Sequence, residues 1–207
     1  MELDGKIQSL NTAIEETVPL LVEDARDNPD AELTIQSLLF ATKPTWLDPV
    51  PVPVEDYRWT PVAAVHQGLT ELGLAILELV PAMREMEAIG RGFAPAIVLV
   101  SDGKPSHVAG PRMEDALEHL LAEPWGRASI RAAIGIGRDA DMGTLHAFMG
   151  KGDLQPVRAD GPEELVSMIQ WMSRMVPNLA SSPAGQDAKM PSPLPPQSGR
   201  AWDVPTS

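Results

Sequence analysis

Two loops of the sequence carry residues of the types that bind cations. Ser101-Asp102-Gly103 follows the apolar run 96–100, which is typical of a strand buried between two helix layers. Thr60-Pro61 stands in a separate loop. In an open parallel sheet, ligands bind beyond the carboxyl ends of the strands. If the two loops meet there, a hydroxyl and a carboxylate converge, and an oxygen-only set of ligands suits Mg²⁺ or Mn²⁺.

Each of these residues also has an ordinary structural interpretation. Threonine caps helices and proline suits the first helical position, so Thr60 taken alone is a helix cap. Asp102 taken alone is a turn residue. Asp139 and Asp141 precede a short predicted helix and are interpreted as caps as well. The four histidines are scattered and lack the H-E-x-x-H spacing of a zinc enzyme.

The elements that must position these loops alternate between helices and strands. Apolar residues at spacings of three and four predict the helices, and short apolar or alternating runs predict the strands. In chain order we expect a helix over 5–26, a strand over 31–41, a helix from Thr60 to about Met86, a strand ending at Val100, a helix over 113–122, a strand over 130–136, a helix over 141–149, a short strand over 154–157 and a last helix from Pro162. This order predicts an α/β fold with a mostly parallel sheet and right-handed crossovers.

The chain divides into one domain and a tail. Residues 1–177 hold all the predicted elements. Residues 178–207 are rich in proline and serine and have few residues that could form a core, so this tail is predicted to be disordered.

Composition excludes several classes of protein. The net charge of −13 argues against nucleic-acid binding, which depends on neutralising phosphates. There is no cysteine, and therefore no disulfide framework or thiolate nucleophile. No apolar run is long enough for a membrane span, and the first residues lack a basic start followed by an apolar block. Together these features favour a cytoplasmic protein.

Several motifs in this order resemble the von Willebrand factor A (vWA) domain, most closely the bacterial cytoplasmic branch associated with tellurium resistance. The motifs are D-G-K-I at 4–7, L-N-x-A-I at 10–14, T-P-x-x-A at 60–64, V-L-V-S-D-G-K-P at 98–105 and the segment 134–145. The resemblance covers roughly residues 1–175. It implies a three-layer, Rossmann-like fold, a role in protein–protein interaction, and no catalysis.

The resemblance also implies a metal-ion-dependent adhesion site that is incomplete in this sequence. The family builds this site from a D-x-S-x-S motif, a threonine in a second loop and an aspartate in a third. Thr60 matches the second element and Asp102 the third, whereas the first is absent. The resemblance therefore assigns Thr60 and Asp102 as metal ligands, with Mg²⁺ or Mn²⁺ bound only if the missing segment lies upstream of Met1.

The missing segment also matters for the sheet, because the family's first strand is central in it. Without that strand, the strands over 31–41 and 94–101 face a gap. Unpaired backbone groups there cost free energy when they are buried away from water, and they promote association with other chains when they are exposed. Three outcomes are open. The protein starts earlier, another chain fills the gap, or the two strands close up into a smaller sheet.

The functional hypotheses differ in class. The first is a binding module that takes a carboxylate of a partner protein at the sheet rim, in a bacterial stress or tellurium-resistance system beside a kinase and a phosphatase. The second is a scaffold protein that has the same fold and binds no metal. The third is an α/β hydrolase that uses Ser101, but the G-x-S-x-G motif is missing, and neither His107 nor His146 has an obvious orienting carboxylate.

Overall fold

The computed structural model describes residues 2–27, 32–63, 70–89, 93–106, 110–150 and 155–180. In chain order the elements are α1 (Glu2–Arg26), β1 (Thr34–Ile35), β2 (Leu38–Phe40), β3 (Pro44–Trp46), β4 (Val52–Pro53), α2 (Leu72–Ile89), β5 (Ala96–Ser101), α3 (Met113–Ala122), α4 (Pro124–Ala128), β6 (Ile130–Ile136), α5 (Met142–Met149), β7 (Val157–Ala159) and α6 (Pro162–Ala180). The fold is α/β, as predicted.

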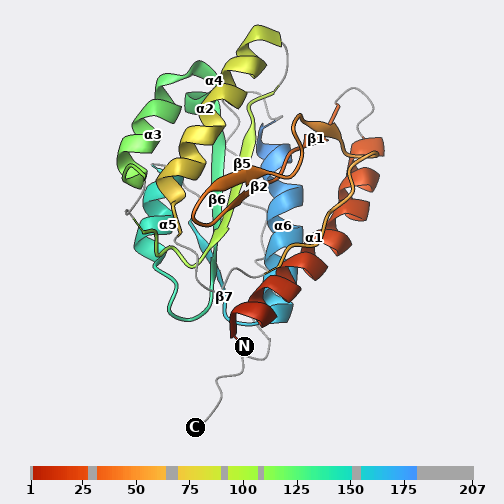
Figure 1. The fold of residues 1–207 in the computed structure, drawn as a ribbon. Helices are drawn as coiled ribbons and strands as arrows, with labels where there is room; N and C mark the ends of the chain where they lie inside the picture. The colour runs from red at the N-terminus through yellow and green to blue at the C-terminus, as the bar shows by residue number, and fades with distance from the viewer. Residues whose placement is uncertain are drawn as a thin grey trace.

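A parallel sheet in the order β5-β6-β7 forms the middle of three layers. Helices α2, α3 and α5 cover one face, and α6 with α1 outside it covers the other (Figure 1). Each face has its own apolar cluster. The first is centred on Ile76, Leu120 and Phe148, and the second on Ile134 and Leu165.

The strands of the parallel sheet follow the apolar runs of the sequence. The predicted strand over 130–136 is confirmed, and β5 ends at Ser101, one residue past the predicted Val100. A short strand is predicted over 154–157, of which residue 154 lies outside the described residues. The structure has β7 over Val157–Ala159, with Val157 opposite Ile134 of β6. The carboxyl ends of these strands meet at one rim.

The strand predicted over 31–41 is wrong as a member of that sheet. This segment forms β1 and β2, which pair antiparallel with β4 and β3 in two separate two-stranded sheets. The chain turns back between β2 and β3, so Leu38 pairs with Trp46 and Phe40 with Pro44. The alternating apolar residues therefore serve two antiparallel strand pairs, which the pattern alone does not distinguish from a parallel strand.

The helix predicted from Thr60 is wrong in its start. Residues 60–63 are not helical, residues 64–69 lie outside the described part of the chain, and α2 begins at Leu72. Leu72 and Ile76, whose spacing of four is of the kind that predicts this helix, are buried. Backbone groups of Val62 bond to the Asn11 side chain on α1, so they do not enter a helical first turn.

The domain boundary and the membrane prediction can be compared with the structure only in part. Helix α6 continues to Ala180, slightly past the predicted boundary at 177, and residues 181–207 of the predicted tail lie outside the described residues. Among the helices of the described chain, none combines the length and apolar character needed to cross a membrane.

Helix α2 depends on a glycine at a close backbone contact. A Cβ added at Gly73 would lie 2.0 Å from the Pro111 carbonyl oxygen, whereas one added at Gly5 on α1 would meet nothing within 4 Å. We expect Gly73→Ala to lower the free energy of unfolding by about 1–3 kcal/mol, because backbone must shift to relieve the overlap. Urea unfolding followed by circular dichroism measures this change.

Gly5→Ala is the matched control. The same substitution in open space should raise the free energy of unfolding by up to about 1 kcal/mol through helix propensity. Equal effects of the two substitutions would contradict the close approach of α2 to the segment around Pro111.

Candidate functional site

The loop after β5 is shaped by the two polar residues that the sequence singles out. The buried Ser101 hydroxyl accepts a hydrogen bond from Gly103 N at 3.1 Å. The Asp102 carboxylate accepts one from Lys104 N, also at 3.1 Å. Short polar side chains commonly stabilise turns in this way. The turn interpretation of Asp102 is therefore confirmed, although its second carboxylate oxygen is not used by this bond.

Glycine is required at the next position of this loop. Gly103 has φ of +69°, which favours a residue without a side chain. A Cβ there would lie 2.5 Å from the Asp141 carbonyl oxygen. The Asp102 carbonyl in turn accepts a hydrogen bond from Asp141 N at 2.8 Å. The loops after β5 and β6 are thus in direct backbone contact at the rim of the sheet.

The two aspartates after β6 have different roles. Asp141 caps α5: its carboxylate accepts from Gly143 N at 3.0 Å, from Thr144 N at 3.2 Å and from the Thr144 hydroxyl at 3.0 Å. These bonds, led by that from the Thr144 backbone, hold the pKa of Asp141 below its ordinary value. Its predicted capping role is confirmed.

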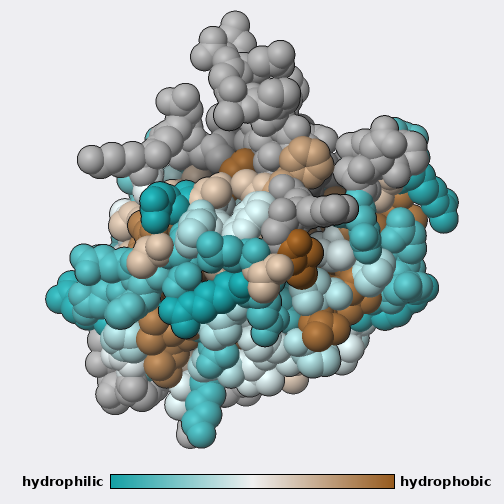
Figure 2. All heavy atoms as spheres, turned by 90° about the horizontal axis from the view of Figure 1, so that it is seen from above, coloured by the Kyte–Doolittle hydropathy of each residue, from teal (hydrophilic) through white to brown (hydrophobic). Residues whose placement is uncertain are grey.

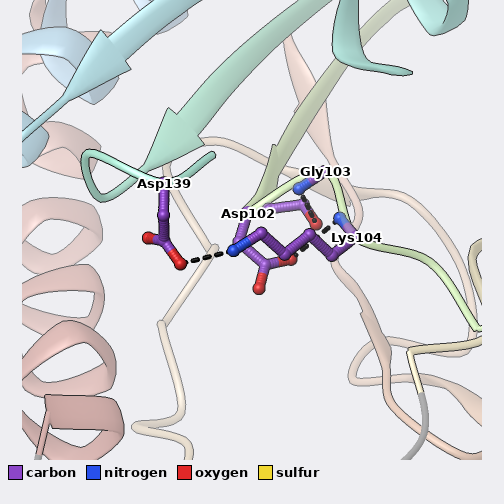
Figure 3. A network of polar contacts seen from close by, with 5 residues as sticks. Asp102, Gly103, Lys104 and Asp139 are labelled. Atoms are coloured by element: carbon purple, nitrogen blue, oxygen red, sulfur yellow. Dashed lines mark hydrogen bonds and ion pairs between the residues drawn. The ribbon is translucent and has the colours of Figure 1, made fainter. Parts of the chain in front are cut away.

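The capping interpretation of Asp139 is wrong. Its carboxylate is paired with the Lys104 ammonium, which crosses from the loop after β5 (Figure 3). Asp139 lies two positions before the capping residue Asp141, so its side chain can point away from the helix and reach the Lys104 ammonium. The hydrogen bond from Lys104 is the main reason that the pKa of Asp139 is lowered.

Lys104 gives the rim its own cation. Asp139 raises the pKa of Lys104 chiefly by accepting its hydrogen bond, with smaller contributions from the charges of Asp102 and Asp141. The side chain passes Asp102 on its way to Asp139 in Figure 3. Three carboxylates from two loops therefore surround one ammonium group, which lowers their mutual repulsion.

A second lysine reaches the rim from α1. Gly137 directly follows β6 and has φ of +94°, and a Cβ at this glycine would lie 2.9 Å from the Lys6 ammonium nitrogen. The charge of Lys6 also contributes to the lowered pKa of Asp139. The amino-terminal end of α1 thus lies at the same rim as the two loops.

The Thr60 segment is held to α1 by one side chain. The Asn11 amide oxygen accepts from the Trp59 indole N–H at 3.1 Å and from Val62 N at 2.9 Å, and the amide nitrogen donates to the Val62 carbonyl at 2.9 Å. These bonds bracket Thr60, which is exposed. Asn11 follows Lys6 by five residues, about 7.5 Å along the helix. The Thr60 segment is therefore held to α1, whereas Asp102 lies in the loop after β5.

The residues of the rim do not by themselves fit a divalent cation. Asp141 is used by its cap, Asp139 is paired with Lys104, and no hydrogen bond joins Thr60 to Asp102 in the described structure. Across the described residues, no group of three or more His, Cys, Asp or Glu side chains is placed to hold a metal. The oxygen cage that Mg²⁺ needs is incomplete.

The geometry around Ser101 is that of a turn. Its hydroxyl is buried and engaged with Gly103 N, whereas a nucleophilic serine needs an exposed oxygen with a base beside it. His146 is exposed on α5, and His107 lies outside the described residues. This arrangement does not favour the hydrolase hypothesis.

Sequence reasoning missed three residues of this region. Lys104 and Asn11 stand inside motifs that the family resemblance uses, but their partners are far away in the sequence, which one sequence does not reveal. Glu71, directly before α2, is fully buried, and a Cβ at Gly110 would lie 3.2 Å from its carboxylate. An acidic residue beside an apolar stripe is the signal that could have drawn attention to it.

Comparisons with known proteins support the fold. No model of a known protein family matches the sequence, and no curated protein matches it. Among solved structures, the chain is similar to proximal thread matrix protein 1 from the mussel byssus in two crystal forms. The identities are 16% and 18% and the TM-scores 0.53 and 0.54, over 82% and 83% of this chain but only 43% and 41% of that protein.

It is also similar to the conserved hypothetical protein BatB from Bacteroides thetaiotaomicron. The identity is 16% and the TM-score 0.50, over 81% of this chain and 88% of the other. This chain therefore spans less than half of the mussel protein and most of BatB. The α/β architecture is vWA-like, as the sequence resemblance implies.

The Lys104–Asp139 pair makes a prediction for titration by NMR. Lys104→Gln should raise the pKa of Asp139 toward its ordinary value of 3.8, and Lys6→Gln should raise it less, because Lys104 makes the direct bond. The side-chain carboxyl ¹³C shift of Asp139 gives each value. An equal or larger effect of Lys6→Gln would contradict the pairing.

The shifted pKa values of Lys104 and Asp139 set the pH range in which this pair stabilises the fold. The lowered pKa of Asp139 gives a contribution that is present above 3.8 and is lost as pH falls through the folded-state value. The raised pKa of Lys104 gives one that is present below 10.5 and is lost as pH rises through its folded-state value. Both side chains are largely exposed, so the contribution is small.

Proposed function

We propose that this chain is a protein-interaction module of the vWA type and that it binds its partner at the carboxyl rim of the parallel sheet. One observation carries the proposal: α1 and the loops after β5 and β6 bring charged side chains together at this rim. Lys104 and Asp139 remain 47% and 71% exposed there. Each of these exposed charges can leave its present partner and pair with an oppositely charged group of a binding protein.

The opposite end of the molecule offers a useful contrast. Figure 2 looks onto the end where β5 begins, and the part of it that is coloured is mostly hydrophilic, with apolar residues in separate small areas. Contiguous apolar patches mark many binding surfaces, and this view shows none among the coloured residues.

We further propose that the rim works without a metal in this chain. Lys104 supplies the positive charge among Asp102, Asp139 and Asp141. Thr60 and Asp102 would serve as ligands of Mg²⁺ or Mn²⁺ only together with a D-x-S-x-S segment, which residues 1–207 do not contain. The complete adhesion site remains the alternative.

The partner and the setting are proposed from the sequence resemblance. It suggests a cytoplasmic scaffold in a bacterial stress or tellurium-resistance system, with a kinase or a phosphatase of that system as partner. The net charge of −13 does not suit nucleic acid. We propose no catalytic role, and the engaged Ser101 hydroxyl supports this view.

Site-specific crosslinking tests the binding face. A photoreactive residue at exposed Arg138 on the rim should capture a partner in the source cell, while one at exposed Glu118 on α3 should not. With that partner purified, Lys104→Glu should weaken binding about tenfold or more, or about 1.4 kcal/mol. Glu118→Lys is the matched charge-reversal control. Capture only from position 118, or equal affinities, would refute the rim as the binding face.

Manganese titration tests the metal-free interpretation. In the wild-type chain, Mn²⁺ should give no saturable broadening of the NMR signals of Asp102 and Thr60. Lys104→Ala should increase Mn²⁺ binding near Asp102, because it removes the competing ammonium, whereas Lys43→Ala on an exposed turn should not. Saturable wild-type broadening at both Thr60 and Asp102 would instead favour the adhesion site.

A further inference from the structure

Two lysine side chains approach the same carboxylate at the rim. The Lys104 ammonium is bonded to Oδ2 of Asp139 (Figure 3). A Cβ at Gly137 would lie 2.9 Å from the Lys6 ammonium nitrogen and 3.1 Å from Oδ1 of Asp139. The space that a side chain would take at this glycine is therefore bordered by a cation and by a carboxylate oxygen. The two ammonium groups come from different elements, helix α1 and the loop after β5.

Asp139 is the carboxylate of the rim that can leave its place most easily. Asp141 accepts three hydrogen bonds from the first turn of α5, and Asp102 accepts one from Lys104 N. Among the described residues, the Asp139 carboxylate is bonded only to the Lys104 ammonium and to its own backbone N–H. Asp139 is 71% exposed, and exposed ion pairs contribute little free energy. Releasing it costs little, whereas releasing Asp102 or Asp141 opens a turn or a cap.

Lys6 is the unused part of this arrangement. None of the ion pairs among the described residues includes Lys6, which is partly buried. Asp139 is bonded to Lys104 and not to Lys6. A carboxylate has two oxygens, and each can accept a hydrogen bond from a different donor. A carboxylate that enters from solvent could therefore bond both ammonium groups at once, which the tethered Asp139 does not.

We propose that Lys6 and Lys104 form a binding site for a carboxylate of the partner protein, and that Asp139 is an internal competitor which occupies this site in the free chain. On binding, the partner's carboxylate takes the place of Asp139, whose side chain returns to solvent. This assignment rests on the proposed function, because it takes the rim as the binding face. It adds the chemical group that is recognised and the contact that is lost on binding.

A carboxylate suits this site better than other ions. The group that occupies it in the free chain is itself a carboxylate, paired with an ammonium. The charges of Asp102 and Asp141 also act on Lys104, so a doubly charged phosphate would meet more repulsion than a carboxylate. A cation would have to approach two ammonium groups. The carboxylate can belong to an acidic side chain or to a chain terminus, and two peptides distinguish these sources.

Peptide titration of the full chain tests the site without knowledge of the partner. The probes are a glycine–aspartate–glycine peptide with both ends capped, the same peptide with asparagine, and acetyl-triglycine with a free carboxyl end. The side-chain Cε and Hε NMR signals of Lys6 and Lys104 report on binding. The aspartate peptide should shift the signals of both lysines in a saturable way, and the asparagine peptide should shift neither. Equal shifts with acetyl-triglycine would show that a chain terminus also serves as the ligand.

Asp139→Asn separates exchange from simple attraction. It removes the competitor, so the aspartate peptide should bind about two- to fivefold more tightly, which is the range that an exposed ion pair accounts for. Asp102→Asn is the matched control, because it removes the same charge from the same rim without freeing an ammonium group, and it should strengthen binding less. In the Asp139→Asn background, Lys6→Gln should abolish the saturable shifts, whereas Lys6→Arg should retain them.

Three results would overturn the proposal. They are an unchanged or weaker affinity of Asp139→Asn for the aspartate peptide, the absence of saturable shifts at both lysines in that variant, and tighter binding of inorganic phosphate than of the peptide. Each of these would leave the rim as the binding face, since crosslinking from Arg138 tests that face separately. Capture of a partner only from position 118 would instead refute the proposed function, and the peptide titration would still show if the two lysines bind a carboxylate.

Discussion

The rest of the structure depends on the burial of β6. Among the described strands, it is the one with a hydrogen-bonded neighbour on each edge and a helix layer on each face. Small residues make this possible, because a Cβ at Gly135 would lie 2.8 Å from the Met142 sulfur and 3.0 Å from a Leu145 methyl carbon. Helix α5 can therefore lie directly on the strand, at the packing density of a protein interior.

The position of α5 in turn fixes the rim. The chain must leave β6, turn at Gly137 and enter α5 within a few residues, which sets Asp141 as the cap beside the loop after β5. The backbone bond from Asp141 N to the Asp102 carbonyl and the glycine at 103 join the two loops. The meeting of charges from the two loops is thus a consequence of core packing, on which the surface chemistry is built.

The sequence predicts the parts of this arrangement that depend on local pattern. The apolar runs of β5 and β6, the cap at Asp141 and the buried stripe of α2 all follow from residue spacing. Alternation over 31–41 predicts a strand but does not identify the partner strand, and the segment pairs outside the parallel sheet. The pattern at Thr60 does not predict the start of α2, because Asn11, far away in the sequence, binds that segment. The Lys104–Asp139 pair likewise joins two loops that are distant in the sequence.

Strand β5 carries the polar rim at its carboxyl end. It runs parallel to β6, and Ser101 lies opposite Gly135 in register, so the loops after the two strands leave the sheet side by side. Lys104 reaches from the first loop to Asp139 in the second, and it supplies the only cation bonded to Asp139 in the described structure. The register of the two strands therefore decides which loops meet, and the residues of those loops decide the charge balance of the rim.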